Sequence, residues 1–352
     1  MMNFSIIWIA LFVLALALVL MGFLMFLLFQ KRRNIRYEIR KKSYKDKLKP
    51  VVQQVVLSGE EGHPRLIENE QIVYEVLAEL LEELTATLKD PFVKMRVNSF
   101  AQWTMKDYYT RMLHHRRFSL RMNALYQIED FNVQSFQELL WQRYKNKTYK
   151  NIAEHYQLVR TLSALGSKEL IYDLLGTHQP YPKFLYKEVL RRLPKIDTER
   201  FIDECDSLPL SFQQAVVEWI GETRDYSRIP FLEDRLESDS IELRISLLKV
   251  LETFGYVSRH DAVLALATSD YFQERMMVAR IAKVTEKERY KSVLVGLLSD
   301  SNWFVRQAAG GALTVYQDGD MILAHVYETS EDPYARDMAH QWLESEGALW
   351  KS

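Results

Sequence analysis

The residue types that most often carry chemistry are few and scattered along the 352-residue chain. Eight histidines occur, and no HExxH motif places two of them one helical turn apart for a metal ion. His114 and His115 are adjacent, and adjacent helical side chains point about 100° apart, which disfavours joint binding of one ion. The sequence therefore predicts no metal ligand and no cofactor.

Cysteine and glycine usage also argues against familiar enzyme chemistry. Cys205 is the single cysteine, which excludes an internal disulfide, a cysteine-based zinc site and a CxxC redox pair. It lies between Glu204 and Asp206, whose charges raise the pKa of a thiol, so a structural role is predicted. The motifs GxGxxG, GxxxxGK[ST] and GxSxG are missing. We therefore predict no catalytic residue and a protein that is not an enzyme.

The composition favours an all-α fold. Hydrophobic residues make up 48% of the chain, enough for a buried core, and disorder as the dominant state is excluded. Gly 12 and Pro 9 are low counts for this length, so the turn-dense pattern of a β-sandwich or barrel is missing.

The first thirty residues are predicted to be a transmembrane anchor. Phe4 to Phe29 contains no charge, and a helix of this length, rising 1.5 Å per residue, covers the roughly 30 Å hydrocarbon core of a bilayer. A cleaved signal peptide is the alternative, but no basic segment precedes the run and its apolar part is too long.

A basic stretch follows the predicted span. Residues 31 to 49 carry a net charge of +8, which places the N-terminus outside and the remaining chain in the cytoplasm at the cell membrane. Residues 50 to 352 carry a net charge of −9, which argues against nucleic-acid binding. The alternatives for the basic stretch are a topology signal and contact with anionic lipid headgroups through Lys31, Arg32, Arg33, Arg36, Arg40, Lys41 and Lys42.

Two segments separate the anchor from the main body. Residues 31 to 64 are predicted to be a juxtamembrane helix and a linker, because Pro50, Gly59, Gly62 and Pro64 interrupt the pattern. Residues 65 to 114 are predicted to be an amphipathic helical cap, because leucines recur at helical spacing from Leu66 to Leu88.

Internal repetition is the strongest pattern in the remaining chain. Segments near residues 235, 270, 297 and 330 align so that Arg244, Arg275, Arg306 and Arg336 share one position, at steps of 31, 31 and 30 residues. Looser spacing extends this repeated position upstream to Gln213, Lys183, His155 and Arg121.

Each repeat is predicted to be two helices joined by a turn. In the second helix, residues one before, three after and seven after the repeated position are apolar, as in Val305, Ala309 and Leu313. Aspartates expected to cap these helices precede them at Asp239, Asp270, Asp300 and Asp332. Such pairs bury their apolar faces by stacking, so an α-α superhelix is predicted for residues 115 to 352.

The run from Asp300 to Leu313 resembles the signature of HEAT repeats. Its period near 31 residues is most similar to the short HEAT-like repeats of phycobilin lyases. Glu274 departs from that pattern, which wants an apolar residue there. The resemblance implies a HEAT-like solenoid.

A partner surface is the predicted functional feature. In HEAT-type stacks, the residues one, two and five after the repeated position line the concave side. Soft apolar side chains with interspersed cations there suit a protein-binding groove. The predicted groove contains Met122, Tyr126, Tyr156, Arg160, Phe184, Leu185, Ile245, Lys249, Met276, Met277, Arg280 and Met338.

The sequence leaves three functions open. The favoured one is a non-enzymatic scaffold, anchored in the lipid bilayer by residues 4 to 29, that presents its solenoid to an unidentified protein, with a membrane enzyme as one candidate partner. The alternatives are an enzyme on a HEAT-like scaffold, such as a tetrapyrrole lyase or base-excising glycosylase, and a sensor of anionic lipid surfaces.

Overall fold

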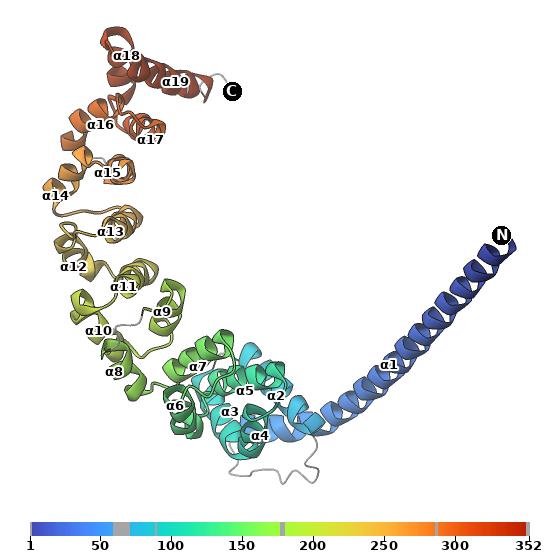
Figure 1. The fold of residues 1–352 in the computed structure, drawn as a ribbon. Coiled ribbons are helices and arrows are strands. Elements are labelled where there is room, and N and C mark those ends of the chain that lie inside the picture. Colours follow the sequence, from blue (N-terminus) through green and yellow to red (C-terminus); the bar gives the residue numbers. More distant parts are fainter. Residues whose placement is uncertain (1, 59–70, 89, 177–179, 286–287, 350–352) are drawn as a thin grey trace. The chain divides into compact units, whose positions relative to one another are not determined.

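A computed structural model describes residues 2–58, 71–88, 90–176, 180–285 and 288–349 (Figure 1). Within these ranges the chain forms nineteen α-helices and five short 3-10 helices, and it contains no strand. The all-α prediction is confirmed. Residues 59–64 of the predicted linker, and Leu66 in the predicted amphipathic helix, lie outside the described residues.

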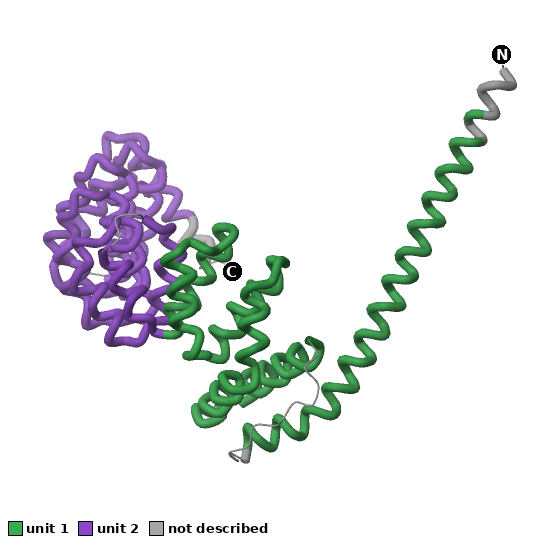
Figure 2. The backbone as a smooth tube through the Cα atoms, turned by 60° about the horizontal axis from the view of Figure 1, so that its bottom comes forward, with its two compact units in different colours: residues 1–165 green, residues 166–352 purple. Residues whose placement is uncertain are grey.

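The chain divides into two compact units, residues 1–165 and 166–352 (Figure 2). The first unit contains α1 (Met2–Ser58), α2 (Gln71–Thr87), α3 (Pro91–Thr104), α4 (Lys106–Leu113), α5 (Phe118–Asp130), α6 (Gln137–Lys145) and α7 (Ile152–Ala164). The predicted boundary between residues 114 and 115 falls inside this unit.

Helix α1 joins the apolar segment to the first unit without a break. Leu11–Leu57 is the one helix in the described residues that is long and apolar enough to cross a membrane, with a mean hydropathy of 3.0 in its most apolar window. The helix continues through Pro50, where a linker was predicted. Val52 and Val56 explain this difference: they lie one turn apart and are buried, which offsets the backbone hydrogen bond that proline removes.

The second unit is a series of helix pairs. Its first helices are α8 (Lys168–Gly176), α10 (Lys195–Asp203), α12 (Ile229–Asp234), α14 (His260–Ala265), α16 (Lys291–Leu297) and α18 (Gly319–Thr329). Its second helices are α9 (Lys183–Leu190), α11 (Leu210–Thr223), α13 (Ile241–Phe254), α15 (Phe272–Thr285), α17 (Trp303–Leu313) and α19 (Pro333–Leu349). Consecutive second helices from α9 to α19 contact one another, and Figure 1 shows them in one row beside the first helices.

The predicted apolar stripe forms the core of the second unit. Val305, Ala309 and Leu313 are fully buried, and the equivalent residues of α11 and α13 are at most 2% exposed. Burying a side chain of this size contributes about 1.5–3 kcal/mol, so each second helix is held mainly by this face. The period of the stripe was predictable because one helix face must meet the core in every repeat.

Two glycines let the last two second helices pack closely. A Cβ atom added to Gly310 would lie 2.2 Å from Cδ1 of Trp342, and one added to Gly311 would lie 2.8 Å from its Cζ2. The indole of α19 therefore occupies the space that side chains would take on α17.

Candidate binding surfaces

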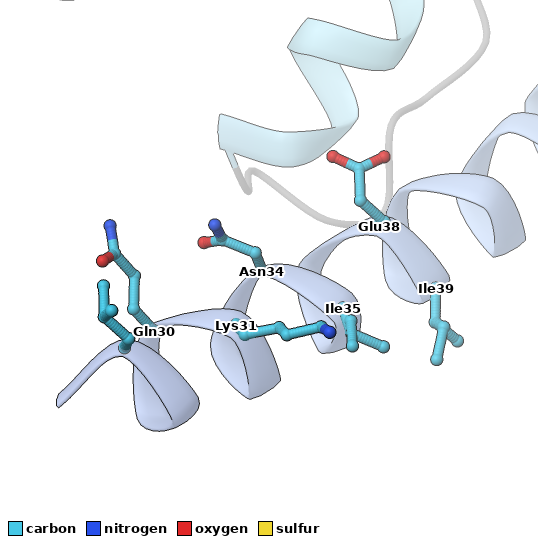
Figure 3. Close-up of a pocket in the computed structure, with 7 residues that line it drawn as sticks. Gln30, Lys31, Asn34, Ile35, Glu38 and Ile39 are labelled. Atoms are coloured by element: carbon cyan, nitrogen blue, oxygen red, sulfur yellow. The ribbon is translucent and has the colours of Figure 1, made fainter. Parts of the chain in front are cut away.

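The basic stretch of α1 is divided between solvent and protein. Residues 31 to 40 are exposed, and Figure 3 shows the shallow surface beside Lys31, Ile35 and Ile39. In the next turns, Lys41 pairs with Glu79 and Lys45 with Glu83, while Tyr37 donates a hydrogen bond to Glu75. In all three contacts the glutamate follows its partner by 38 residues, so both helices advance in the same direction and α1 and α2 run parallel.

The predicted lipid contacts therefore differ in their availability. Lys31, Arg32, Arg33, Arg36 and Lys42 are exposed and make no ion pair with another described residue. Lys41 is committed to Glu79 on α2, so its ammonium group is not free for a headgroup as predicted. Arg40 is exposed and also has an interaction partner. Fewer of the predicted residues are therefore available for lipid contact than the sequence indicated.

Arg96 fixes the C-terminal end of α1. Its guanidinium Nη1 donates to the carbonyl oxygens of Val56 and Leu57, at 3.3 and 2.6 Å. Carbonyl groups in the last turn of a helix have no partner within the helix, and a cation there also favours the helix dipole. The end of α1 is thus bound to α3 and moves with it.

The arginine at the repeated position has one structural role in every repeat that contains it. Its Nη1 donates to the carbonyl oxygen six residues earlier, at 2.5 to 2.9 Å, and so closes the turn before the second helix. This contact, which we call the arginine clamp, is made by Arg121, Arg244, Arg275, Arg306 and Arg336. The residues that give the strongest sequence signal therefore stabilise turns.

Three of the clamps also bind a carboxylate further along the chain. Arg121 pairs with Glu154 at 2.8 Å, and both side chains are buried. Arg244 and Arg275 pair with Glu274 and Asp300, each at 2.6 Å. These carboxylates follow their arginines by 25 to 33 residues, so each ion pair joins neighbouring repeats.

Glu274 is fully buried, and its pairing explains why the chain departs from the HEAT-like pattern there. Its carboxylate accepts hydrogen bonds from Arg244 and from the Ser269 hydroxyl. A carboxylate without such partners would be costly at this depth.

Other residue types replace the clamp upstream. The Gln213 amide donates to the carbonyl oxygen of Leu208 at 2.8 Å and so closes its turn as arginine does. Lys183 is the first residue of α9, whereas the clamp arginines are fourth in their helices. The fourth residue of α9 is Tyr186, whose hydroxyl accepts from the Tyr181 amide at 2.9 Å. The equivalent residue in that repeat is thus Tyr186.

The predicted caps are only partly found. The Asp332 carboxylate accepts from the amide of Tyr334 at 3.0 Å, as predicted. Ser240 caps α13 and Asn302 caps α17 in place of the predicted aspartates. Asp300 instead accepts from the guanidinium of Arg275. Burial raises the pKa of Asp300, but this hydrogen bond and a backbone amide outweigh it and hold the pKa below its usual value.

The residues of the predicted groove differ in their exposure. Its exposed members are Tyr126, Phe184, Lys249 and Arg280. Its half-buried members are Tyr156, Arg160, Ile245 and Met276. Its buried members are Met122, Leu185, Met277 and Met338. Met277 and Met338 do not belong to a surface as predicted, because both side chains are at most 3% exposed.

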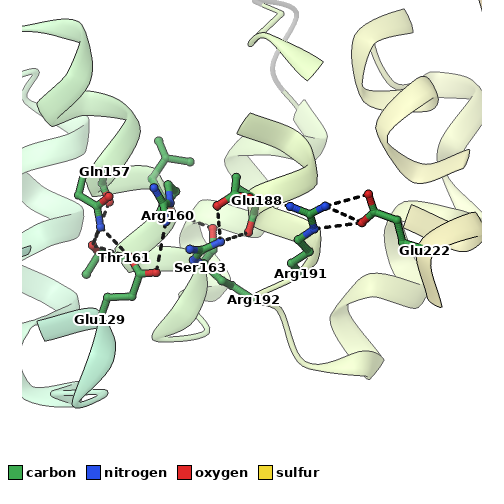
Figure 4. Close-up of polar contacts among 10 residues, drawn as sticks. Glu129, Gln157, Arg160, Thr161, Ser163, Glu188, Arg191, Arg192 and Glu222 are labelled. Carbon is green, nitrogen blue, oxygen red and sulfur yellow. Dashed lines mark hydrogen bonds and ion pairs between the residues drawn. The ribbon is translucent and has the colours of Figure 1, made fainter. Parts of the chain in front are cut away.

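Ion pairs cross the exposed face of the second helices. In α9 and α11, Lys187 lies 2.8 Å from Glu218. Arg191 lies 2.8 Å from Glu222, and Figure 4 shows this pair. Further along the second unit, Arg280 on α15 pairs with Glu252 on α13 at 2.7 Å. Exposed pairs of this kind are worth at most about 1 kcal/mol each, so their main effect is to set the register of neighbouring helices.

The first unit holds Arg160, one of the predicted groove residues, in a polar network. Gln157 donates to the Glu129 carboxylate at 2.7 Å, and Arg160 approaches the same group at 4.0 Å (Figure 4). Glu129 lies on α5 and the other two on α7. Arg160 is thus engaged within its own unit.

Where the chain is described, the cysteine thiol is buried and the two adjacent histidines make local hydrogen bonds. Burial raises the pKa of Cys205 to about 12, so its thiol stays protonated at neutral pH. His114 contacts the carbonyl oxygen of Thr110 at 2.8 Å, and His115 accepts from the Arg117 amide at 2.9 Å. No group of three or more metal-ligating side chains converges within the described residues.

A row of aromatic rings, all exposed except the half-buried Phe272, was not predicted from the sequence. It lies at the N-terminal ends of α15, α17 and α19, and we call it the aromatic edge: Tyr271, Phe272, Trp303, Phe304 and Tyr334. The signal that could have revealed it is the recurrence of aromatic residues two to four positions before the clamp arginine.

Comparisons with known proteins add little to this description. No protein-family model matches the chain, and no curated protein matches it by sequence. Two crystal structures of engineered proteins from the Northeast Structural Genomics Consortium align at 14% identity. The first alignment covers 88% of this chain and 95% of the other, with a TM-score of 0.33; the second covers 80% and 94%, with a TM-score of 0.18. Such low TM-scores carry no argument.

Proposed function

We propose that this protein is a membrane-anchored, non-enzymatic scaffold. Helix α1 anchors it, with the N-terminus outside and the helical body in the cytoplasm. The helix pairs stack as a HEAT-like α-α superhelix, and the exposed face of the second helices binds a partner protein. A membrane enzyme is one candidate partner.

The observation that carries this proposal is the arginine clamp. The same guanidinium contact recurs in α5 of the first unit and in four second helices of the second unit, where consecutive second helices contact one another. Repeats that each contact the next create long surfaces, which suit the binding of another protein. The apolar part of α1 supports the anchor, because it is exposed and continues as one helix into the first unit.

The orientation can be tested with single cysteines. Asp320→Cys introduces an exposed thiol on α18, and Asn3→Cys introduces one before the predicted span. Native Cys205 is buried and remains unreactive. In intact cells, an impermeant maleimide should label Asn3→Cys and should label Asp320→Cys only after permeabilisation. Labelling of Asp320→Cys in intact cells would reverse the proposed orientation.

The scaffold role can be tested with a photoreactive side chain in the full chain. Lys249 is exposed on the second-helix face, and Tyr256, 56% exposed after the C-terminal end of α13, is the matched control. A discrete crosslinked protein from position 249 and none from position 256 is expected. Identical products from both positions, or none from position 249, would refute a partner surface on this face.

A lipid role is supported by one specific observation. Lys31, Arg32, Arg33 and Arg36 are exposed directly after the apolar segment, where headgroups lie if α1 spans the bilayer. Each such cation contributes about 1 kcal/mol at an anionic surface. Replacing these four by Gln should reduce enrichment in anionic over zwitterionic nanodiscs, whereas Lys41→Gln should not. If Lys41→Gln reduced the enrichment as much as the four-residue variant does, the distinction between the exposed cations and the paired Lys41 would be contradicted.

A further inference from the structure

The aromatic edge is continuous across three second helices. The ring centroids of Phe272 and Phe304 lie 6.5 Å apart, and those of Trp303 and Phe304 lie 5.2 Å apart. The Arg306 guanidinium lies 4.7 Å from the ring centroid of Tyr334 and joins the last ring to the row. Neighbouring packed helices lie 8–10 Å apart, so the edge extends over roughly 20 Å.

Large apolar side chains on this edge are open to solvent. Tyr271, Trp303, Phe304 and Tyr334 are between 48% and 59% exposed. Burial of four such rings by a partner would remove a large apolar area from water, which is the main source of binding free energy at interfaces.

Exposed carboxylates lie next to two of these rings in the sequence. We call Asp270 and Glu331 the acidic rim; they belong to the turns before α15 and α19. Neither side chain makes an ion pair or hydrogen bond with another described residue, but Asp270 also attracts the nearby charge of Arg275. Residues 166 to 352 contain 22 Lys and Arg against 31 Asp and Glu, a net charge of −9, so the rim lies in a unit of negative charge.

From this arrangement we infer that the aromatic edge and the acidic rim bind a basic segment of a partner protein in which Arg or Lys alternates with apolar side chains. The inference rests on the proposed scaffold function and names the chemistry of its partner. Apolar side chains of the segment cover the rings, while its cations reach ring faces and rim carboxylates. The contact of Arg306 with Tyr334 is a cation–π pair of this kind within the chain.

Size and charge favour a protein segment over a bilayer. An edge of roughly 20 Å matches about six extended residues at 3.3 Å each. Exposed rings also suit a membrane interface, but anionic headgroups would repel Asp270 and Glu331. Acidic residues near helix N-termini also favour the helix dipole, and that role does not require exposed rings beside them.

The test uses the full chain in nanodiscs of zwitterionic lipid. The probe is a fluorescent eight-residue peptide in which Arg alternates with Leu, and its counterpart has Glu in place of Arg. The ring variant is Tyr271→Ser with Trp303→Ser, and the charge variant is Asp270→Lys with Glu331→Lys. We expect the wild type to bind the Arg peptide and not the Glu peptide, and each variant to weaken binding by roughly tenfold or more.

Matched controls and salt dependence separate this site from general attraction. Tyr256→Ser with Asp320→Lys removes an exposed ring and reverses an exposed charge elsewhere in the unit, and it should bind as the wild type does. The ring variant should keep the salt dependence of binding, and the charge variant should lose most of it. Circular dichroism should show that all variants remain helical. Equal binding by both peptides, or equal losses in control and edge variants, would overturn the inference.

Three further outcomes would show that a second copy or a membrane covers the aromatic edge, or would separate failure of this inference from failure of the scaffold function. If the wild type forms dimers that both edge variants dissolve, a second copy occupies the edge and the inference fails. If anionic vesicles bind the wild type but not the ring variant, the edge contacts a membrane and the inference also fails. If peptide binding fails while the crosslink from position 249 persists, the inference is refuted and the scaffold function stands.

Discussion

The buried ion pair between Arg244 and Glu274 permits a quantitative prediction about the repeats. We expect Glu274→Leu to destabilise the second unit, although leucine restores the apolar residue that the HEAT-like pattern has there. The substitution removes the carboxylate that accepts hydrogen bonds from Arg244 and from Ser269. The guanidinium would keep its contact with the carbonyl oxygen of Ser238 at 2.5 Å.

The size of the loss follows from the burial of the two partners. Breaking a buried ion pair by removing one partner costs about 3–5 kcal/mol. Glu274 is fully buried, but the Arg244 side chain is 15% exposed, so water can hydrate part of the charge that remains. We therefore expect a loss near the lower end, about 3 kcal/mol. Adding Arg244→Leu removes the orphaned charge and leaves one turn carbonyl unpaired, a cost of about 1 kcal/mol.

The double mutant should therefore be more stable than Glu274→Leu alone, a coupling that distant, independent sites do not show. Urea unfolding of the full chain in detergent, with hydrogen exchange across α13 and α15, measures it. Glu252→Leu is the matched control: it breaks the pair with Arg280, whose side chain is 48% exposed, and should cost at most about 1 kcal/mol. If Glu274→Leu is as stable as the wild type, our account of this residue is refuted.

Three other outcomes are expected. Gly311→Ala should lower thermal stability by about 1–3 kcal/mol because its Cβ would meet Trp342, whereas Gly296→Ala has open space and should raise it by about 0.5–1 kcal/mol. The guanidinium partner of Asp300 holds the pKa of its carboxyl below the usual value. The carboxylate therefore contributes its full stabilisation above the unfolded pKa of about 3.9, and this contribution is lost as the pH falls through the folded pKa. Asp300→Asn should weaken the pH dependence of the urea midpoint between pH 5 and pH 3. The thiol of Cys205, with a pKa of about 12, should react with maleimide at neutral pH only as fast as the second unit unfolds.

Sequence patterns predicted the helices and their buried faces well, because both depend on local spacing. The stripe through Leu243, Leu247 and Leu251 is buried as its period indicates. The position of a residue relative to the repeated arginine does not show which sides of the helix are covered by neighbouring helices. For this reason Met277 was predicted to line a groove. That assignment depends on how consecutive second helices contact one another.

Long-range partners were also outside the reach of local patterns. Leucine spacing predicted an amphipathic helix in residues 65 to 114, but it could not show that Glu75, Glu79 and Glu83 engage Tyr37, Lys41 and Lys45 of α1. Pro50 indicated a break, yet burial of Val52 and Val56 outweighs the hydrogen bond that it removes. In both cases residues far away in the sequence decide the environment.

In this chain the residues that recur most regularly in the sequence are not the ones most available to a partner. The clamp arginines recur because their repeats have the same turn to close, and this use directs the Nη1 group of each arginine to a carbonyl oxygen of the same chain. A partner needs groups that the fold leaves exposed, and these vary from one repeat to the next: Tyr271 before α15, Trp303 in α17 and Tyr334 in α19. Substituting the most regular residues should therefore reduce stability first. Specificity for a partner depends instead on the irregular side chains at the N-terminal ends of the second helices.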